Sequence, residues 1–264
     1  MSIKQITSKD TTKIAYHVVG NGPAVILVDG AFCDSSFGPS KDLAKLLSKH
    51  FTVYSYDRRG RGKSGDEQPY SVDKEIQDLS ALLKEAGGVA HIFGNSSGAV
   101  LAMKAAAAGL DLKNLAFFEP PFFVGNQKNK PPKDHQETLK MYNENGEAAK
   151  AVTFFLTKIM GVPCIFALLM RLSPNWKKMK AMAKSLQYES AVMDDFSLPG
   201  NLLKTIKQPS IVIGGAKSPE VLQTACKAVA ETMPNAALVM LPKQNHNIDV
   251  NVLAPVLIDF FSNT

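Results

Sequence analysis

Six short apolar runs recur along the chain, and helical patterns separate most of them. The runs cover residues 24–28, 51–56, 90–93, 115–118, 210–213 and 237–241. Continuous apolar runs, in contrast to alternating ones, are typical of strands in a parallel sheet that is covered on both faces. The opening segments 3–7 and 12–19 alternate instead, which predicts an antiparallel hairpin at one edge. Together these patterns predict an α/β protein with a mostly parallel, doubly wound sheet.

The strand–helix alternation stops after Phe118 and resumes near residue 200. Residues 127–199 show helical patterns without strands, so we predict a core formed by residues 1–126 and 200–264 and a helical cap formed by the insertion. The insertion holds six of the ten methionines. Such helices can line an adaptable apolar pocket or simply form the insertion's own core, and both interpretations stay open.

Composition narrows the class of protein. The three cysteines are scattered without metal-like spacing, and the N-terminus lacks the apolar stretch of a signal peptide, so we expect a cytoplasmic protein without a metal or cofactor. The apolar segment 151–172 is interrupted by Lys158, Gly161 and Pro163, which argues against a membrane span. The net charge is +6, but its lysines are spread out. We therefore expect a small-molecule substrate and neither a nucleic-acid nor a membrane partner.

The segment Gly94-Asn95-Ser96-Ser97-Gly98 lies between a predicted strand and an alanine-rich helix. A G-x-S-x-G sequence in this context predicts a sharp turn that lifts the central hydroxyl above the sheet, so Ser96 is the candidate nucleophile. The turn is crowded, and glycines on either side of it leave the needed room. The N-terminus of the following helix also presents free N–H groups to negative charge. The alternative is that the two serines only cap the helix.

A serine nucleophile needs a base, and His246 is the best placed of the five histidines. It follows the last predicted strand, at the carboxyl edge of the sheet where active sites of open α/β sheets form. It also comes after Ser96 in the chain, as the order serine, acid, histidine requires. His17 and His91 lie within predicted strands, which favours structural roles.

Four motifs together resemble the α/β-hydrolase-fold family, in its compact bacterial form with a helical cap. They are VILVDGAF at 25–32, YDRRGRGKSGD at 56–66, the GNSSG turn and LPKQNHN at 241–247. The resemblance implies an oxyanion hole built from the backbone N–H groups of Ala31 and Ser97. Asp29 stands where the family usually has histidine, and it would bring a carboxylate near the site.

The acid of the site departs from the usual family pattern. Its usual place is near Ser218, but Ser218-Pro219-Glu220 predicts a helix start, with Ser218 as N-cap and Glu220 as a dipole partner. Glu119 ends an apolar strand one strand earlier, where a partly buried carboxylate needs a partner. Certain haloalkane dehalogenases resemble this arrangement, so we assign Glu119 to orient His246.

Other interpretations of these acidic residues remain. Glu119 can instead be a structural carboxylate that accepts backbone N–H groups. Asp194 and Asp195 are weaker candidates for the acid. In the arginine-rich loop, we expect Arg58, Arg59 and Arg61 to tie the loop to neighbouring segments, with Asp57 holding its turn.

The motifs predict a metal-independent serine hydrolase that acts on a small to medium ester, lactone or thioester through an acyl-enzyme. A carbon–carbon bond hydrolase or lyase of the same fold is one alternative, and a small-molecule receptor with little turnover is another. Candidate pocket residues combine the oxyanion loop with the cap: Asp29, Phe32, Phe154, Phe155 and Met160.

Overall fold

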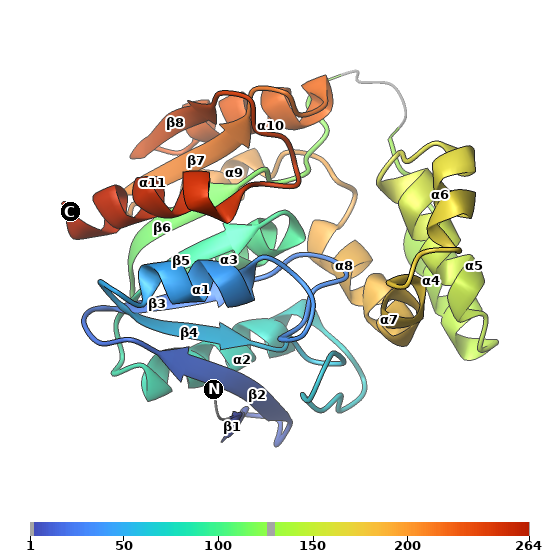
Figure 1. Ribbon diagram of the computed structural model, residues 1–264, viewed down its shortest axis with the longest axis horizontal. Helices are drawn as coiled ribbons and strands as arrows, with labels where there is room; N and C mark the ends of the chain where they lie inside the picture. The colour runs from blue at the N-terminus through green and yellow to red at the C-terminus, as the bar shows by residue number, and fades with distance from the viewer. Residues whose placement is uncertain (1–2, 126–129, 264) are drawn as a thin grey trace.

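The computed structural model describes residues 3–125 and 130–263 and contains one eight-stranded sheet (Figure 1). Its strand order is β1-β2-β4-β3-β5-β6-β7-β8. The first strands, β1 (Lys4–Thr7) and β2 (Lys13–Val19), pair as an antiparallel hairpin, and β2 also runs antiparallel to β4 (Thr52–Tyr56). The predicted fold class and edge hairpin are confirmed.

The other strands are parallel to β4 and to one another. They are β3 (Ala24–Val28), β5 (Ala90–Asn95), β6 (Leu112–Phe118), β7 (Ser210–Gly215) and β8 (Ala236–Leu241). The chain order changes direction around β3, which pairs with β4 on one side and β5 on the other. Ligands of open α/β sheets bind at the carboxyl ends of strands beside such a switch point.

Alternate residues of the central strands belong to two separate hydrophobic clusters. Val25 and Leu27 pack with α1 (Ser40–Leu47) and α11 (Val250–Ser262), whereas Ile26 and Val28 pack with the helices of the opposite face. That face carries α2 (Val72–Glu85), α3 (Ser97–Ala107), α9 (Gly200–Leu203) and α10 (Glu220–Thr232). Because side chains alternate along a strand, apolar residues on both faces produce the continuous runs seen in the sequence.

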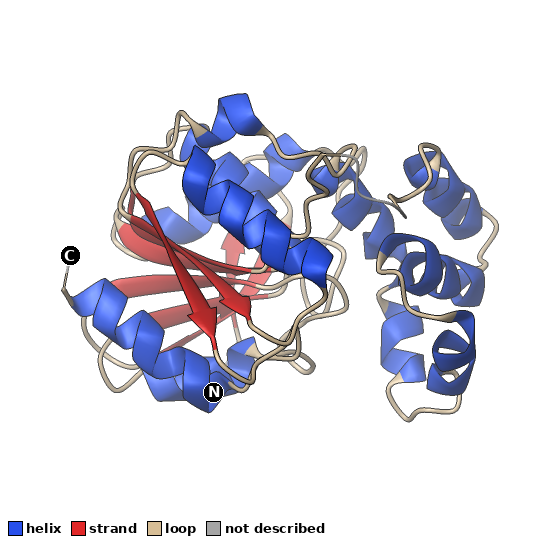
Figure 2. Cartoon of the chain, turned by 90° about the horizontal axis from the view of Figure 1, so that it is seen from above, coloured by secondary structure: helices blue, strands red, loops and turns tan. Residues whose placement is uncertain are grey.

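The insertion forms helices that lie to one side of the sheet (Figures 1 and 2). They are α4 (His135–Glu144), α5 (Ala148–Phe154), the π-helical turn η1 (Phe155–Ile159), α6 (Cys164–Met170), α7 (Trp176–Ala181), the 3₁₀ turn η2 (Ala183–Ser185) and α8 (Leu186–Met193). The predicted boundary at residues 126 and 127 lies outside the described residues. Helix α8 packs against α2 and α3, so it joins the core spatially.

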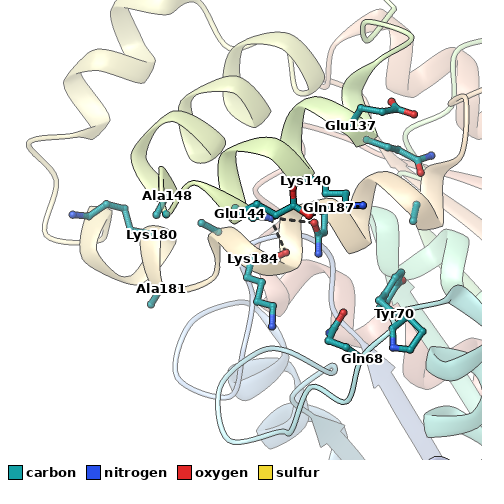
Figure 3. Close-up of a pocket in the computed structure, with 16 residues that line it drawn as sticks. Gln68, Tyr70, Glu137, Lys140, Glu144, Ala148, Lys180, Ala181, Lys184 and Gln187 are labelled. Atoms are coloured by element: carbon teal, nitrogen blue, oxygen red, sulfur yellow. Dashed lines mark hydrogen bonds and ion pairs between the residues drawn. The ribbon is translucent and has the colours of Figure 1, made fainter.

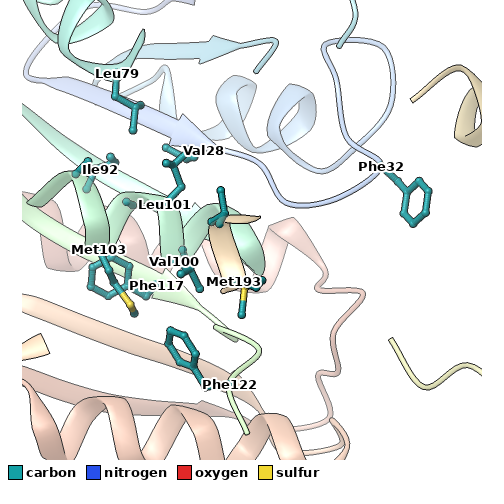
Figure 4. Close-up of a cluster of buried hydrophobic side chains, with 14 of the residues drawn as sticks. Val28, Phe32, Leu79, Ile92, Val100, Leu101, Met103, Phe117, Phe122 and Met193 are labelled. Carbon is teal, nitrogen blue, oxygen red and sulfur yellow. The ribbon is translucent and has the colours of Figure 1, made fainter. Parts of the chain in front are cut away.

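One side chain reaches out from the core toward the insertion. Phe32, in the loop that follows β3, lies apart from the other labelled core side chains in Figure 4. Its ring meets that of Phe155 edge to face, with the centroids 5.5 Å apart. Among the described residues, no helix is both long and apolar enough to cross a membrane.

Candidate active site

The turn between β5 and α3 has the strained geometry that its sequence predicts. Ser96 has φ 56° and ψ −125°, a backbone conformation that residues with a Cβ rarely adopt. Two glycines make the turn possible. A Cβ on Gly98 would overlap the carbonyl oxygen of Val28, and one on Gly30 would lie 2.9 Å from the Cβ of Ser96. The loop after β3 therefore lies directly against the serine turn.

Glu119 and His246 are brought together across 127 residues of sequence. His246 Nδ1 lies 2.7 Å from Glu119 Oε2. The carboxylate of Glu119 is fully buried, whereas the imidazole keeps 31% of its surface exposed. The other oxygen, Oε1, accepts the backbone N–H of Gly215 at 2.7 Å and the hydroxyl of Ser218. The buried carboxylate is thus supplied with donors on both oxygens.

The predicted N-cap role of Ser218 is wrong. Helix α10 begins at Glu220, its N-cap position is Pro219, and no side chain caps it. The Ser218 hydroxyl turns instead to Glu119, because a carboxylate without water gains more from a donor than an exposed helix end does. Glu220 stays exposed in the first helical turn.

Ser96 and His246 line one cavity of about 350 Å³ at the carboxyl edge of the sheet. Ala31 and Ser97, the predicted oxyanion residues, line it as well. The rest of the wall is mostly apolar and comes from the β6–cap connection, the cap and α10: Pro121, Phe123, Phe155, Ile159, Met160, Gly161, Met193, Phe196, Pro219, Val221 and Leu222, together with Glu189.

Two of the five predicted pocket residues, Phe155 and Met160, line this cavity. Phe32 lies behind Phe155 as its aromatic neighbour. Phe154 is absent from the cavity wall, and its ring packs against that of Tyr142, with the centroids 6.0 Å apart. Asp29 lines a different cavity beside Tyr56 and is absent from the wall of the cavity around Ser96.

The methionines of the insertion divide between the two roles left open by the sequence. Met160 lines the cavity, Met179 and Met182 are buried within the hydrophobic cluster, and Met193 does both. Helical spacing alone does not separate these roles, since both kinds of surface are apolar.

A wider groove of about 850 Å³ lies between α4, α7, α8 and the loop at Gln68 and Tyr70 (Figure 3). Its labelled side chains carry both charges, among them Glu137, Lys140 and Lys184. Neither Ser96 nor His246 belongs to its wall. The groove therefore supplies no nucleophile and base for the chemistry predicted from the sequence.

A buried charge cluster beneath the serine turn is absent from the sequence predictions. Glu189, on α8, pairs with Arg58 at 2.8 Å and with Arg61, and it accepts the hydroxyl of Ser97. Arg58 also binds Glu75 through two hydrogen bonds of 2.7 Å. All four charged side chains are buried. The only sequence signal for Glu189 is a carboxylate within an otherwise mostly apolar helix.

The same cluster holds the loop after β3. Arg61 donates to the carbonyl of Gly30 at 2.6 Å, and Arg58 donates to that of Asp29 at 3.2 Å. Burial lowers the pKa of Arg61 to about 10, which leaves the guanidinium protonated at neutral pH. The arginines thus tie the loop to neighbouring segments, as expected. Asp57 likewise accepts the N–H of Lys63 within the loop at 2.8 Å.

Asp194 and Asp195, the weaker candidates for the acid, lie away from His246 in the hydrogen-bond network. Asp195 accepts the N–H and hydroxyl of Ser197, and Asp194 ends α8 with φ 55°. Neither belongs to the cavity wall. His91 lies inside β5, where burial lowers its pKa to about 4. This environment keeps the His91 ring neutral and fits the structural role expected for it.

Comparison with known proteins agrees with this architecture. A model of the alpha/beta hydrolase family matches residues 25–256, and the chain belongs to that family. The structure is similar to the crystal structure of an alpha/beta hydrolase from Sphaerobacter thermophilus, with 42% identity and a TM-score of 0.91 over 98% of this chain and 100% of that one.

Two curated relatives match over a shorter region. An uncharacterized hydrolase of Bacillus subtilis, YraK, is 37% identical over 103 residues, and an N-formylmaleamate deformylase of Pseudomonas putida is 34% identical over 119 residues. These alignments span 38% and 43% of this chain, and 35% and 43% of the respective relatives. The chain therefore matches less than half the length of either.

Breaking the buried charge cluster is expected to destabilise the protein strongly. In Glu189→Gln, Arg61 loses its carboxylate partner inside the protein, and the free energy of unfolding should fall by about 3–5 kcal/mol. Urea unfolding measures this difference. The exposed pair Lys45–Asp42 supplies the control, because Asp42→Asn should leave the unfolding midpoint unchanged. Equal, small effects of both changes would contradict the importance of the cluster.

A second prediction concerns pH. Burial raises the pKa of Asp29 from 3.8 to about 6, so the unfolded chain ionises this carboxyl at lower pH than the folded protein does. The stabilisation that comes from the neutral Asp29 carboxyl is fully present below the pKa of the unfolded chain, 3.8. It is lost as the pH rises to about 6, which lowers the free energy of unfolding by up to about 3 kcal/mol. Asp29→Asn should therefore raise Tm at pH above 7 and lose that advantage toward pH 4. A pH-independent difference would contradict this.

Proposed function

We propose that the protein is a serine hydrolase that cleaves a small to medium ester, lactone or thioester through an acyl-enzyme. The observation that carries this proposal is the 2.7 Å contact between Glu119 and His246 beside the cavity that Ser96 also lines. A histidine held by a buried carboxylate is the activating arrangement that a serine nucleophile requires.

In the proposed reaction, the Ser96 hydroxyl attacks the substrate carbonyl carbon while His246 takes its proton. Glu119 binds Nδ1 of the ring, so the proton on the imidazole stays at that nitrogen and Nε2 serves as the base. Glu119 also stabilises the imidazolium that forms. His246 then protonates the leaving group, and a water molecule activated by the same histidine hydrolyses the acyl-enzyme.

The negative oxygen of the intermediate is assigned to the backbone N–H groups of Ala31 and Ser97. Ser97 is the first residue of α3, so its N–H also carries the positive end of the helix dipole. The buried charge cluster anchors the segments that carry these two N–H groups. Arg61 donates to the carbonyl of Gly30, and Glu189 accepts the hydroxyl of Ser97. Such anchoring favours donors that are already in place when charge develops.

The cavity wall supports an acyl group or alcohol with an apolar part. A volume of about 350 Å³ lies at the lower end of the range for small-molecule sites, and most wall residues are apolar. Ser96 also disfavours the dehalogenase and epoxide-hydrolase reactions of this fold, which need a carboxylate nucleophile. The similarity to a deformylase adds an N-formyl amide to the substrates worth testing.

A fluorophosphonate probe tests whether Ser96 is activated. The probe should form a covalent adduct on Ser96 at neutral pH, because only an activated serine displaces its leaving group quickly. Mass spectrometry of a peptide digest locates the adduct, and Ser96→Ala is the control. An unlabelled wild-type protein would contradict the proposed function. A series of 4-nitrophenyl acyl esters then separates a hydrolase, with steady turnover, from a receptor that binds without turnover.

Removing the charge of the acid tests the assignment of Glu119. Glu119→Gln should lower kcat by at least about tenfold, because the amide neither fixes the ring tautomer nor stabilises the imidazolium. A thermal melt of the same sample confirms that the variant is folded. Asp195→Asn is the matched control and should keep full activity. If Glu119→Gln kept activity while Asp195→Asn or Asp194→Asn lost it, the acid would be assigned wrongly.

A further inference from the structure

The insertion carries a cluster of exposed large apolar side chains away from the catalytic residues. In the sequence around α6, Leu172 is 84% exposed, and four further side chains are between 53% and 59% exposed: Ile165, Phe166, Leu168 and Leu169. We call these five side chains the α6 face. A typical exposed apolar residue stands alone, whereas five on one short segment mark a contact surface.

The spacing of the α6 face matches one side of a helix. At 3.6 residues per turn, the four of these side chains that belong to α6 fall within roughly 160° of arc, and Ala167 falls on the opposite side. Leu172 follows two residues after the helix ends. Ala167 is fully buried against the rest of the insertion. Helix α6 therefore buries a small residue and exposes its large apolar residues to solvent.

The charged residues closest to α6 along the chain are all basic. Residues 148–188 contain seven lysines and arginines and no aspartate or glutamate. Two of the seven have acidic partners, Lys150 with Glu147 and Lys184 with Asp66. The other five are exposed and form no ion pair with described residues: Lys158, Arg171, Lys177, Lys178 and Lys180. Arg171 directly follows α6 and stacks over Trp176, 5.8 Å from the ring centroid, whereas Lys178 lies over Phe37 of the core and Lys180 lines the wide groove. The cations next to the α6 face are therefore Arg171 and Lys158, the latter on η1, which packs against α6.

We infer that the α6 face docks on an anionic phospholipid surface. Aliphatic side chains with cations beside them suit the boundary between headgroups and acyl chains, where the apolar residues are buried and the cations meet phosphates. Helix α6, at seven residues, is far too short to cross a bilayer and would lie along its surface. This peripheral contact departs from the expectation, drawn from spread lysines, that the protein has no membrane partner.

Two other binding partners, a second copy of the protein and single-stranded nucleic acid, fit this face less well. A second copy bound through the same face would bring two groups of unpaired cations together, which is repulsive. Single-stranded nucleic acid is bound through aromatic side chains on which bases stack, and the α6 face is mainly aliphatic. Met160 lies three residues before Pro163, the N-cap of α6, and also lines the catalytic cavity, so the docked face would place the cavity mouth near the lipid.

Sedimentation with lipid vesicles tests the proposal with the full chain and without any turnover. Wild-type protein should bind vesicles of phosphatidylcholine and phosphatidylglycerol at least about tenfold more tightly than vesicles of phosphatidylcholine alone, and added salt should weaken the binding. Ile165→Asp with Leu169→Asp should reduce binding to the anionic vesicles by at least about tenfold. Neither residue lines the catalytic cavity, so hydrolysis of a soluble 4-nitrophenyl ester should be unchanged.

Val89→Asp is the matched control, because Val89 is 48% exposed just before β5, at the opposite end of the strands. It should bind vesicles like the wild type. The proposal is overturned if the wild type does not bind anionic vesicles. It is also overturned if the double variant Ile165→Asp with Leu169→Asp binds these vesicles as tightly as Val89→Asp does. It is also overturned if the wild type is a dimer that the α6 variant dissociates and that shows no affinity for lipid.

Discussion

Glu189 joins two parts of the molecule that the chain order keeps apart. It reaches from α8, at the end of the insertion, to two arginines of the loop after β4 and to the first residue of α3. The ions lie in a low-dielectric interior, where each depends on the others for compensation. Because Arg61 in turn holds Gly30, the cluster adds a link between the loop after β3 and the serine turn to the strand pairing of β3 with β5.

Several strained backbone conformations lie around the same cavity. Phe32, Ser96, Glu119 and Phe196 all have positive φ values although none is glycine. Each belongs to a different segment, and each either lines the cavity or contacts a residue that does. Conformations of this kind persist only where surrounding contacts determine them, as the glycines beside Ser96 and the donors around Glu119 do here.

The sequence predicted most of what depends on local pattern. The strand at Ala24–Val28 has the predicted bounds, since a continuous apolar run is a local signal. The pairing of Glu119 with His246 was predicted from the place of Glu119 at the end of an apolar strand and from the resemblance to certain haloalkane dehalogenases. Contacts between distant segments escaped prediction: Glu189 lies 92 residues from Ser97, and Ser218 turned to Glu119, 99 residues away, in place of capping its own helix.

The position of α8 determines which part of the insertion could be exchanged between related proteins. Although α8 lies within the inserted sequence, the buried charge of Glu189 pairs with arginines of the sheet-bearing core, and α8 packs against α2 and α3 of the core as well as against α4 of the insertion. The segment that can be exchanged between related chains is therefore shorter than the insertion and ends before Leu186. Chimeric proteins that replace residues 130–181 would keep the core's buried ions, while longer replacements would import a helix whose partners stay behind.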